Sequence, residues 1–362
     1  MFHTNFFKIV KPVYINGAAC ISAQKSLEPD FLESLEINLS ENIIYAQQPN
    51  YKDFIPPAQI RRMSKVVKMG IVSAEKAMDA AGISMPDAII TGTGMGCTED
   101  SEKFLRNVIQ NNEDHLTPTN FIQSTHNTVA GQIALGIGCH AYNFTYVSSG
   151  SSLEFSLLDA KLQIENGEAR QVLVGACDET ANRTAELYQL AKIIKKQDEF
   201  PIDLLNSETE GVFWGEGAAF FVLTDEKLEN SSSEVKAVEI SNVLELEETE
   251  SFAENFLQKN GLKSADIDLV LLGFSGDKSA DEFHKKMRDF FKKSQLGFWK
   301  HLSGEFNTSS GFAVFLANEI LGKQRIPEII KINSAERKQI RTVLIYNNFL
   351  GKEHSFTLLT KA

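Results

Sequence analysis

Short apolar runs of strand length alternate with helical patterns along the whole of this 362-residue chain. The predicted strands are Val13–Ala19, Ala88–Thr93, Asn143–Ser148, Gln171–Cys177, Ala218–Thr224, Val235–Val243, Ile267–Phe274, Ile329–Ile332, Arg341–Tyr346 and Phe356–Leu359. The predicted helices are Pro57–Ala81, Ser101–Gln110, Thr128–Leu135, Ser151–Glu165, Ala253–Lys259 and Gly311–Leu321. Such alternation is typical of α/β proteins, in which helices cover parallel or mixed sheets.

A polar, Ser-rich connector, DEKLENSSSEVKAVE, divides the chain into a longer first part and a shorter second part. We place the division after residue 228, which gives parts of residues 1–228 and 229–362. No short internal repeat and no low-complexity tail interrupts either part.

The charge balance excludes several partner classes. The formal net charge is −12 and the sequence pI is about 5.2, whereas nucleic acids and anionic membranes are bound by basic surfaces. No window approaches 18 uninterrupted apolar residues, so we expect no membrane span. The N-terminus has no signal-peptide pattern, and we expect a cytoplasmic protein.

The four cysteines are Cys20, Cys97, Cys139 and Cys177, and no two of them form a CxxC pair. The seven histidines show no HExxH or similar ligand spacing. We therefore expect buried thiols, no metal site and no cofactor.

One stretch has the layout of a nucleophile elbow. TYVSSGSSLEFSLLDAKLQIENGEAR, residues 145–170, predicts a buried strand, a sharp turn and an amphipathic helix. Many enzymes mount a nucleophile at such a turn, but here the turn residue is Gly150, which has no side chain. By itself the pattern also fits an ordinary βα corner.

Further segments give the elbow a context. From Gly150 the helix, the NGEAR turn and the strand ending at Glu179 form one continuous register. The sequence then contains FPIDLLNSETEGVFWGEGAAFFVL at 200–223, LGFSGDKSADE at 272–282 and KHLSGEFNTSSGFAV at 300–314. In this order, and with the early helix PAQIRRMSKVVKMG, they resemble the β-ketoacyl-acyl-carrier-protein synthases. The resemblance implies an α/β, thiolase-like fold, in which two related βα halves form α-β-α-β-α layers.

The resemblance also implies which residues should carry chemistry. Family enzymes hold the acyl chain on an elbow cysteine and use two histidines in decarboxylation and oxyanion stabilisation. Here Gly150 stands at the cysteine position, Phe274 at the first histidine and Glu305 at the second, while the family's lysine is retained as Lys300. We expect a carboxylate at 305 to repel an anionic substrate. We therefore expect no catalytic residues.

Two other family features are also altered. The glutamate that the family places fourteen residues after its lysine is Val314, and the Gly-Phe-Gly-Gly gating loop is replaced by FLGKE at 349–353. An inactive member of this kind resembles the chain-length factors, which pair with an active ketosynthase and shape its acyl tunnel. Because aromatic-polyketide chain-length factors commonly carry Gln at the elbow, Gly150 favours an aryl-polyene or flexirubin-type branch.

The resemblance places the partner interface on the strand that leads into the elbow, residues 142–148. Phe144 and Tyr146 alternate there with smaller side chains, and we expect them in the interface with an active ketosynthase homologue. The loop 117–127 would lie near the partner's acyl tunnel, with Phe121 and Ile122 closing its end. Ordinary core roles for these two residues stay open.

Acyl carrier protein is acidic, and this chain is a poor docking surface overall. A possible exception is the basic group Arg61, Arg62, Lys65 and Lys68, although we prefer to interpret it as a solvated helix face. We expect carrier protein to dock mainly on the active partner.

Two alternatives stay open on the sequence. One is a thiolase-fold acyltransferase with reassigned chemistry, which would need a base within reach of Ser149 or Ser151. The other is a homodimeric acyl-chain-binding protein, which sequence does not separate from a heterodimer subunit.

Overall fold

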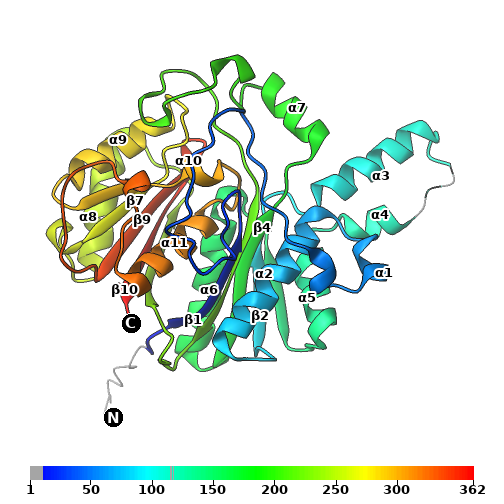
Figure 1. The fold of residues 1–362 in the computed structure, drawn as a ribbon, viewed down its shortest axis with the longest axis horizontal. Helices are drawn as coiled ribbons and strands as arrows, with labels where there is room; N and C mark the ends of the chain where they lie inside the picture. Colours follow the sequence, from blue (N-terminus) through cyan, green and yellow to red (C-terminus); the bar gives the residue numbers. More distant parts are fainter. Residues whose placement is uncertain (1–10, 115, 117) are drawn as a thin grey trace, which may run out of the picture.

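The computed structural model describes residues 11–362 except for residues 115 and 117. Within this part, ten strands form one continuous sheet in the order β3-β2-β4-β5-β1-β6-β10-β9-β7-β8. Figure 1 shows the strands with helices packed around them. The strands are β1 Tyr14–Ile21, β2 Ala88–Gly92, β3 Tyr142–Tyr146, β4 Gln171–Asp178, β5 Gly217–Thr224, β6 Ser233–Ser241, β7 Leu269–Leu272, β8 Gln295–Phe298, β9 Thr342–Phe349 and β10 Lys352–Lys361.

The two halves of this sheet repeat one topology. From its outer edge inward the first half runs β3-β2-β4-β5-β1, and the second runs β8-β7-β9-β10-β6. In each half the first two pairings are parallel and the last two are antiparallel. The halves meet where Tyr14 and Ile15 of β1 pair with Glu234 and Ser233 of β6. The expectation of two related βα halves is therefore confirmed.

Helices cover these strands in layers. They are α1 Pro57–Ile60, α2 Lys65–Ala81, α3 Thr98–Gln110, α4 Pro118–Gln123, α5 Thr128–Ile137, α6 Ser152–Asn166, α7 Asn182–Leu190, α8 Thr249–Lys259, α9 Asp281–Phe290, α10 Lys300–Ser303 and α11 Ser310–Lys323. One apolar cluster joins α6 and α11 to strands of both halves. A second joins α2 and α5 to the first half, and a third joins α8 and α9 to the second.

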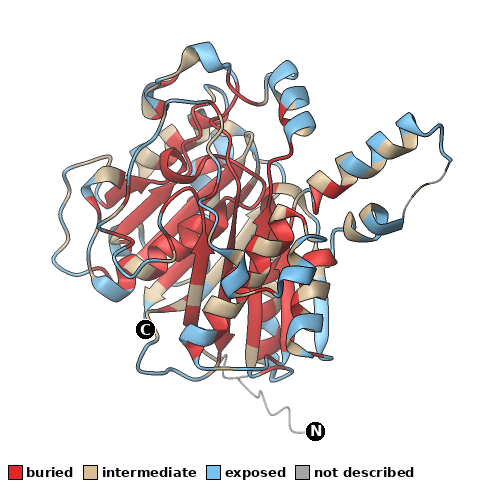
Figure 2. Ribbon diagram, turned by 45° about the vertical axis from the view of Figure 1, so that its right-hand side comes forward, coloured by how far each residue is buried: buried red, intermediate tan, exposed pale blue. Residues whose placement is uncertain are grey.

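These three clusters correspond to the two outer helix layers and the central one, and so to the expected α-β-α-β-α order of a thiolase-like fold. Apart from β3 and much of β6, the strands are largely buried, whereas α3 and α4 stand off the body as an exposed arm (Figure 2). The elbow turn lies at the start of α6, at the end of the central layer.

Two predicted elements are wrong. The predicted helix Pro57–Ala81 is two helices, because the chain turns at residues 61–64 and Ser64 takes an extended backbone before α2. The predicted strand Ile329–Ile332 is a 3-10 helix at Glu328–Ile330 followed by a single bridge between Lys331 and Gly297. The true edge strand is β8, which the sequence does not predict, and α4, α7, α9 and α10 are not predicted either. Helix α4 lies within the segment 117–127 that was expected to be a loop.

In the part of the chain described by the structure, none of the helices is long and apolar enough to cross a membrane. The division at residue 228 into two domains stays a prediction. Thr117, the first residue of the predicted tunnel loop, lies outside the described residues.

Candidate functional site

The elbow forms because a small residue lets the helix approach the sheet. A Cβ atom on Gly92 of β2 would lie 2.5 Å from the Ser152 carbonyl oxygen, so only glycine permits this packing. The Ser152 hydroxyl donates to the Thr93 carbonyl at 3.0 Å and accepts from the Ser148 N–H at 2.9 Å. A 3-10 turn, Ser149–Ser151, then places Gly150 in a buried position.

The space for a nucleophile at Gly150 is already filled. A Cβ atom added there would lie 2.1 Å from the Phe349 Cβ and 2.9 Å from Glu353 Oε2. The Gly150 N–H donates to the same Glu353 oxygen at 2.5 Å. Any side chain at this position would therefore have to displace the C-terminal segment that contains Phe349 and Glu353.

Glu305 is paired rather than free. Its carboxylate lies 2.5 Å from the Lys300 Nζ, and both side chains are completely buried. The Ser309 hydroxyl donates to the other carboxylate oxygen at 2.8 Å. Burial raises the pKa of Glu305, and the Lys300 ammonium opposes that rise. The Lys300 ammonium therefore balances the charge of Glu305, and the expected repulsion of an anionic substrate stays a prediction.

Phe274 is a core residue in the third apolar cluster. Its ring centroid lies 5.2 Å from that of His284 on α9, a histidine that sequence analysis missed. Burial holds the pKa of His284 well below its ordinary value, so this ring is neutral. No family motif marks His284, because its position depends on how α9 packs rather than on a local pattern.

The remaining candidate bases are tied elsewhere. The His301 ring stacks on Phe298 with centroids 3.8 Å apart, and its Nε2 lies 3.1 Å from the Ile329 carbonyl oxygen. The Ser149 hydroxyl accepts from Asn307 Nδ2 at 3.1 Å. Among the described residues, no hydrogen bond links Ser149 or Ser151 to a histidine. No group of three or more His, Cys, Asp or Glu side chains there is arranged to hold a metal ion.

Two buried acids beside the elbow have structural partners. Asp178, at the end of β4, accepts hydrogen bonds from the backbone N–H groups of Gly94 and Met95 and from the Thr308 hydroxyl. Glu216, in the Gly-Glu-Gly-Ala segment, accepts from the Thr180 N–H at 2.9 Å and pairs with the Lys65 Nζ at 2.6 Å. These residues fasten loops around the elbow.

The candidate carrier-protein group does not form one helical face. Arg61 and Arg62 are exposed in the turn between α1 and α2. Lys65 is engaged by Glu216, and the Lys68 ammonium lies 5.3 Å from the centre of the Tyr51 ring. Two of the four cations are therefore committed to contacts within the chain.

The candidate interface strand, β3, lies at the outer edge of the sheet. The side chains of Tyr142 and Phe144 are 46% and 44% exposed. The rings of Tyr142, Phe144, Tyr146 and Phe155 form a continuous ladder with successive centroid distances of 6.1, 4.9 and 6.0 Å. This ladder runs from the open edge to helix α6.

The two candidate tunnel residues lie on the arm. Phe121 and Ile122 of α4 are 56% and 61% exposed, and the Phe121 ring packs on Phe104 of α3 with centroids 5.2 Å apart. They are therefore not core residues of the single chain, and the arm presents them to the outside.

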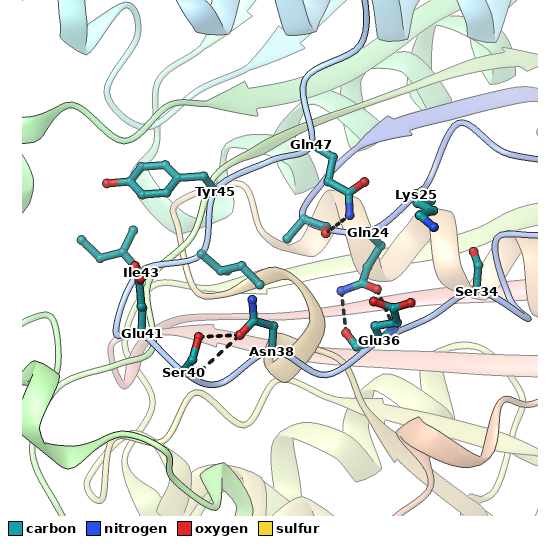
Figure 3. Close-up of a pocket in the computed structure, with 12 residues that line it drawn as sticks. Gln24, Lys25, Ser34, Glu36, Asn38, Ser40, Glu41, Ile43, Tyr45 and Gln47 are labelled. Carbon is teal, nitrogen blue, oxygen red and sulfur yellow. Dashed lines mark hydrogen bonds between the residues drawn. The ribbon is translucent and has the colours of Figure 1, made fainter.

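A separate polar pocket lies in the loop 23–47 and has a volume of about 320 Å³ (Figure 3). Gln24 Nε2 donates to the Glu36 carbonyl at 3.0 Å and to the Leu302 carbonyl of α10 at 2.9 Å, and the Glu36 N–H donates back to Gln24 Oε1 at 2.9 Å. None of the elbow residues lines it.

Fold and site together define a thiolase-like protein with a ketosynthase elbow. The family model for the N-terminal domain of β-ketoacyl synthases matches residues 45–228, just over half of the chain. The chain belongs to the β-ketoacyl synthase family. No curated protein sequence matches it significantly.

Solved structures agree on the fold. The ishigamide ketosynthase/chain length factor superposes with a TM-score of 0.82 at 15% identity, covering 97% of this chain and 99% of that one. A β-ketoacyl synthase from Burkholderia phymatum STM815 gives 0.79 at 15% identity, covering 97% and 100%. The AntDE:AntF structure, a type II PKS acyl-carrier protein in complex with its ketosynthase, gives 0.75 at 16% identity, with 97% and 100% covered. At such identities the likeness concerns the fold.

Proposed function

We propose that this chain is a non-catalytic β-ketoacyl synthase-like subunit that pairs with an active ketosynthase and shapes its acyl tunnel. The observation that carries this proposal is an open aromatic edge strand, β3, directly before an elbow that has no nucleophile and no room for one. The pathway would be a fatty-acid or polyketide-type elongation of the aryl-polyene kind. We propose a cytoplasmic location, in keeping with four cysteines that are all free.

An exposed edge strand with large apolar side chains needs a cover, because its unpaired backbone groups invite association. A second chain of the same fold supplies a matching strand, so that two sheets continue as one across the pair. Because Phe144 is 44% exposed in the single chain, enclosing its ring would contribute roughly 1 kcal/mol, about half the value for burying a whole Phe side chain.

Loss of catalysis follows from three positions at once. In a well-studied hydrolase, removing the nucleophile or the base alone costs roughly 10⁶ in turnover. Here Gly150 provides no nucleophile, Phe274 is an apolar core residue and Glu305 is locked to Lys300. We therefore assign condensation to the partner, and carrier-protein docking mainly to the partner as well.

Co-expression with a ketosynthase encoded beside this chain tests the proposal. A one-to-one complex should purify, whereas this chain alone, incubated with acyl-carrier protein, should show no covalent acyl adduct by mass spectrometry. Failure to form the complex would contradict the pairing, and an adduct on Ser149 or Ser151 would contradict the non-catalytic role.

One observation favours a homodimeric acyl-chain-binding protein as a second candidate. A groove of about 850 Å³ lies between α1, α2 and α5, with Met63, Met78 and Ile133 among its apolar lining and Arg62 and Glu75 among its charged lining. A chain purified alone that elutes as a dimer and yields fatty acids on organic extraction would support this reading over the heterodimer.

A further inference from the structure

The turn between β9 and β10 lies directly over the elbow. Phe349 is the last residue of β9, Leu350 and Gly351 form the turn, and Glu353 is the second residue of β10. Phe349 and Glu353 together occupy the volume that a side chain at Gly150 would need. The segment that replaces the family's gating loop is thus the element that closes the elbow.

Glu353 occupies the elbow as a ligand would. Its carboxylate accepts the Gly150 N–H at 2.5 Å, close to the N-terminus of the 15-residue helix α6, where negative charge is favoured. Leu350 and Glu353 have φ angles of +54° and +50°, which residues other than glycine rarely adopt. Such backbone persists where the surrounding contacts determine it.

Those contacts start from Lys300 and His284. The Lys300 Nζ donates to the Asn348 carbonyl at 3.1 Å, and Asn348 Nδ2 lies 3.0 Å from His284 Nε2. Asn348 Oδ1 in turn accepts the Gly351 N–H at 2.9 Å. The retained lysine and the buried histidine are therefore connected to the turn through one asparagine.

We propose that the elbow is a carboxylate-binding site whose ligand is the chain's own Glu353, and that Lys300 and His284 act through Asn348 as positioning residues for it. The site takes a carboxylate because its donor is the backbone N–H at a helix N-terminus. This inference rests on the proposed non-catalytic role and explains why a lysine is kept without the histidines it would assist.

Alkylation of a thiol at the elbow tests the closure. The variants are Gly150→Cys and Gly150→Cys/Phe349→Ala/Glu353→Ala, treated with iodoacetamide and followed by mass spectrometry. The wild type supplies the blank, because its four cysteines are buried. The single variant should react at least about tenfold more slowly than the triple variant, since a tenfold change corresponds to 1.4 kcal/mol of occlusion. Equal rates would overturn the proposal.

Hydrogen exchange at the Gly150 amide keeps the proposal testable if a cysteine variant fails to fold. Glu353→Ala should speed this exchange, Glu353→Gln should preserve protection because its amide oxygen still accepts, and sodium acetate should restore protection to Glu353→Ala. Unchanged exchange in Glu353→Ala, or no effect of acetate on it, would overturn the assignment of a carboxylate site.

Asn348→Ala tests the positioning role against a matched control on the same strand, Asn347→Ala. The Asn347 side chain is buried and makes no hydrogen bond in the structure. Exchange at Gly150 should rise in Asn348→Ala and stay low in Asn347→Ala, whereas equal exchange in both would overturn the role. All these variants should still co-purify with a ketosynthase. A chain that never pairs but keeps Gly150 protected would therefore refute the proposed function alone.

Discussion

β3 and β8 are the edge strands of the two halves of the fold, but β3 is largely exposed whereas β8 is buried. Each is the outermost strand and pairs in parallel with one neighbour, β2 or β7. All four residues of β8 are buried, whereas the first three residues of β3 are exposed. The difference shows which end of the molecule is complete within one chain.

The chain itself covers β8. The Ile332 N–H donates to the Leu296 carbonyl at 2.9 Å, and Asn333 Oδ1 accepts the Leu296 N–H at 2.9 Å. These contacts take backbone groups of the edge strand that would otherwise be free to pair with another chain. No such segment lies over the aromatic ladder of β3 in the described chain, which is why we place the partner there.

The largest expected effect follows from a charge on the open edge. Because Phe144 is 44% exposed in the single chain, Phe144→Lys would remove roughly 1 kcal/mol of apolar burial at the interface and leave an unpaired ammonium in it, which adds a larger cost. Because 1.4 kcal/mol is a factor of ten, affinity for the ketosynthase should fall on the order of 100-fold. Co-purification and analytical ultracentrifugation at graded concentrations measure the loss.

Val243→Lys is the matched control, because this side chain is exposed apolar surface in the loop after β6. It makes the same chemical change away from β3 and should leave association intact. If Phe144→Lys still co-elutes at full stoichiometry, the β3 edge is not the interface.

A substitution at the covered edge, β8, should lower the free energy of unfolding and leave association with the partner unchanged. Asn333→Ala removes the acceptor for the Leu296 N–H and for Gln295 Nε2, and the donor to the Ser294 carbonyl. Leaving buried polar groups unpaired costs about 1 to 3 kcal/mol each. Urea denaturation should show a loss of that size, with affinity for the partner unchanged. A simultaneous loss of pairing would make both ends of the sheet part of the interface.

The sequence predicted the fold well where the signal is local and repeated. The alternating apolar runs located nine of the ten strands, and the register from Gly150 located the elbow. The sequence did not predict β8, because this strand has only four residues and one of them is Gly297. The run 329–332 is richer in apolar residues than β8, so it was predicted as a strand in place of β8. The segment predicted as a strand is therefore the one that covers the edge strand β8.

The site could be predicted only in part for a similar reason. The resemblance to the family predicts that Gly150, Phe274 and Glu305 depart from the active pattern. The contact between Gly150 and Glu353 joins positions 203 residues apart, and it depends on the turn that follows β9. The pairing of Lys300 with Glu305 is close in sequence but depends on how α10 ends, at a glycine with a positive φ, Gly304.

A smaller effect concerns acid stability at the covered edge. Burial lowers the pKa of His301 from 6.5 to about 3, so the unfolded chain binds more protons than the folded chain between these values. Stability from this group is complete above pH 6.5 and falls as the pH falls, by up to about 2 kcal/mol at pH 5. His301→Gln should therefore lose less stability than the wild type between pH 7 and 5 in urea titrations. Parallel losses would mean that His301 is not buried as the cover over β8 requires.

The smallest effect on the chain itself is expected at the arm, where Ile122 of α4 is 61% exposed. Because its side chain is mostly solvent-exposed, Ile122→Ala should change the free energy of unfolding by less than about 0.5 kcal/mol.

If Ile122 closes the partner's tunnel, the shorter side chain deepens that tunnel, and the reconstituted pair should release longer acyl products. Leu190→Ala, an equally conservative change at an exposed position on α7, should alter neither quantity. Mass spectrometry measures the length of the acyl products, and a denaturation curve measures the free energy of unfolding. Unchanged product length with an intact complex would show that α4 does not close the partner's tunnel, so that the arm formed by α3 and α4 could contribute only to association.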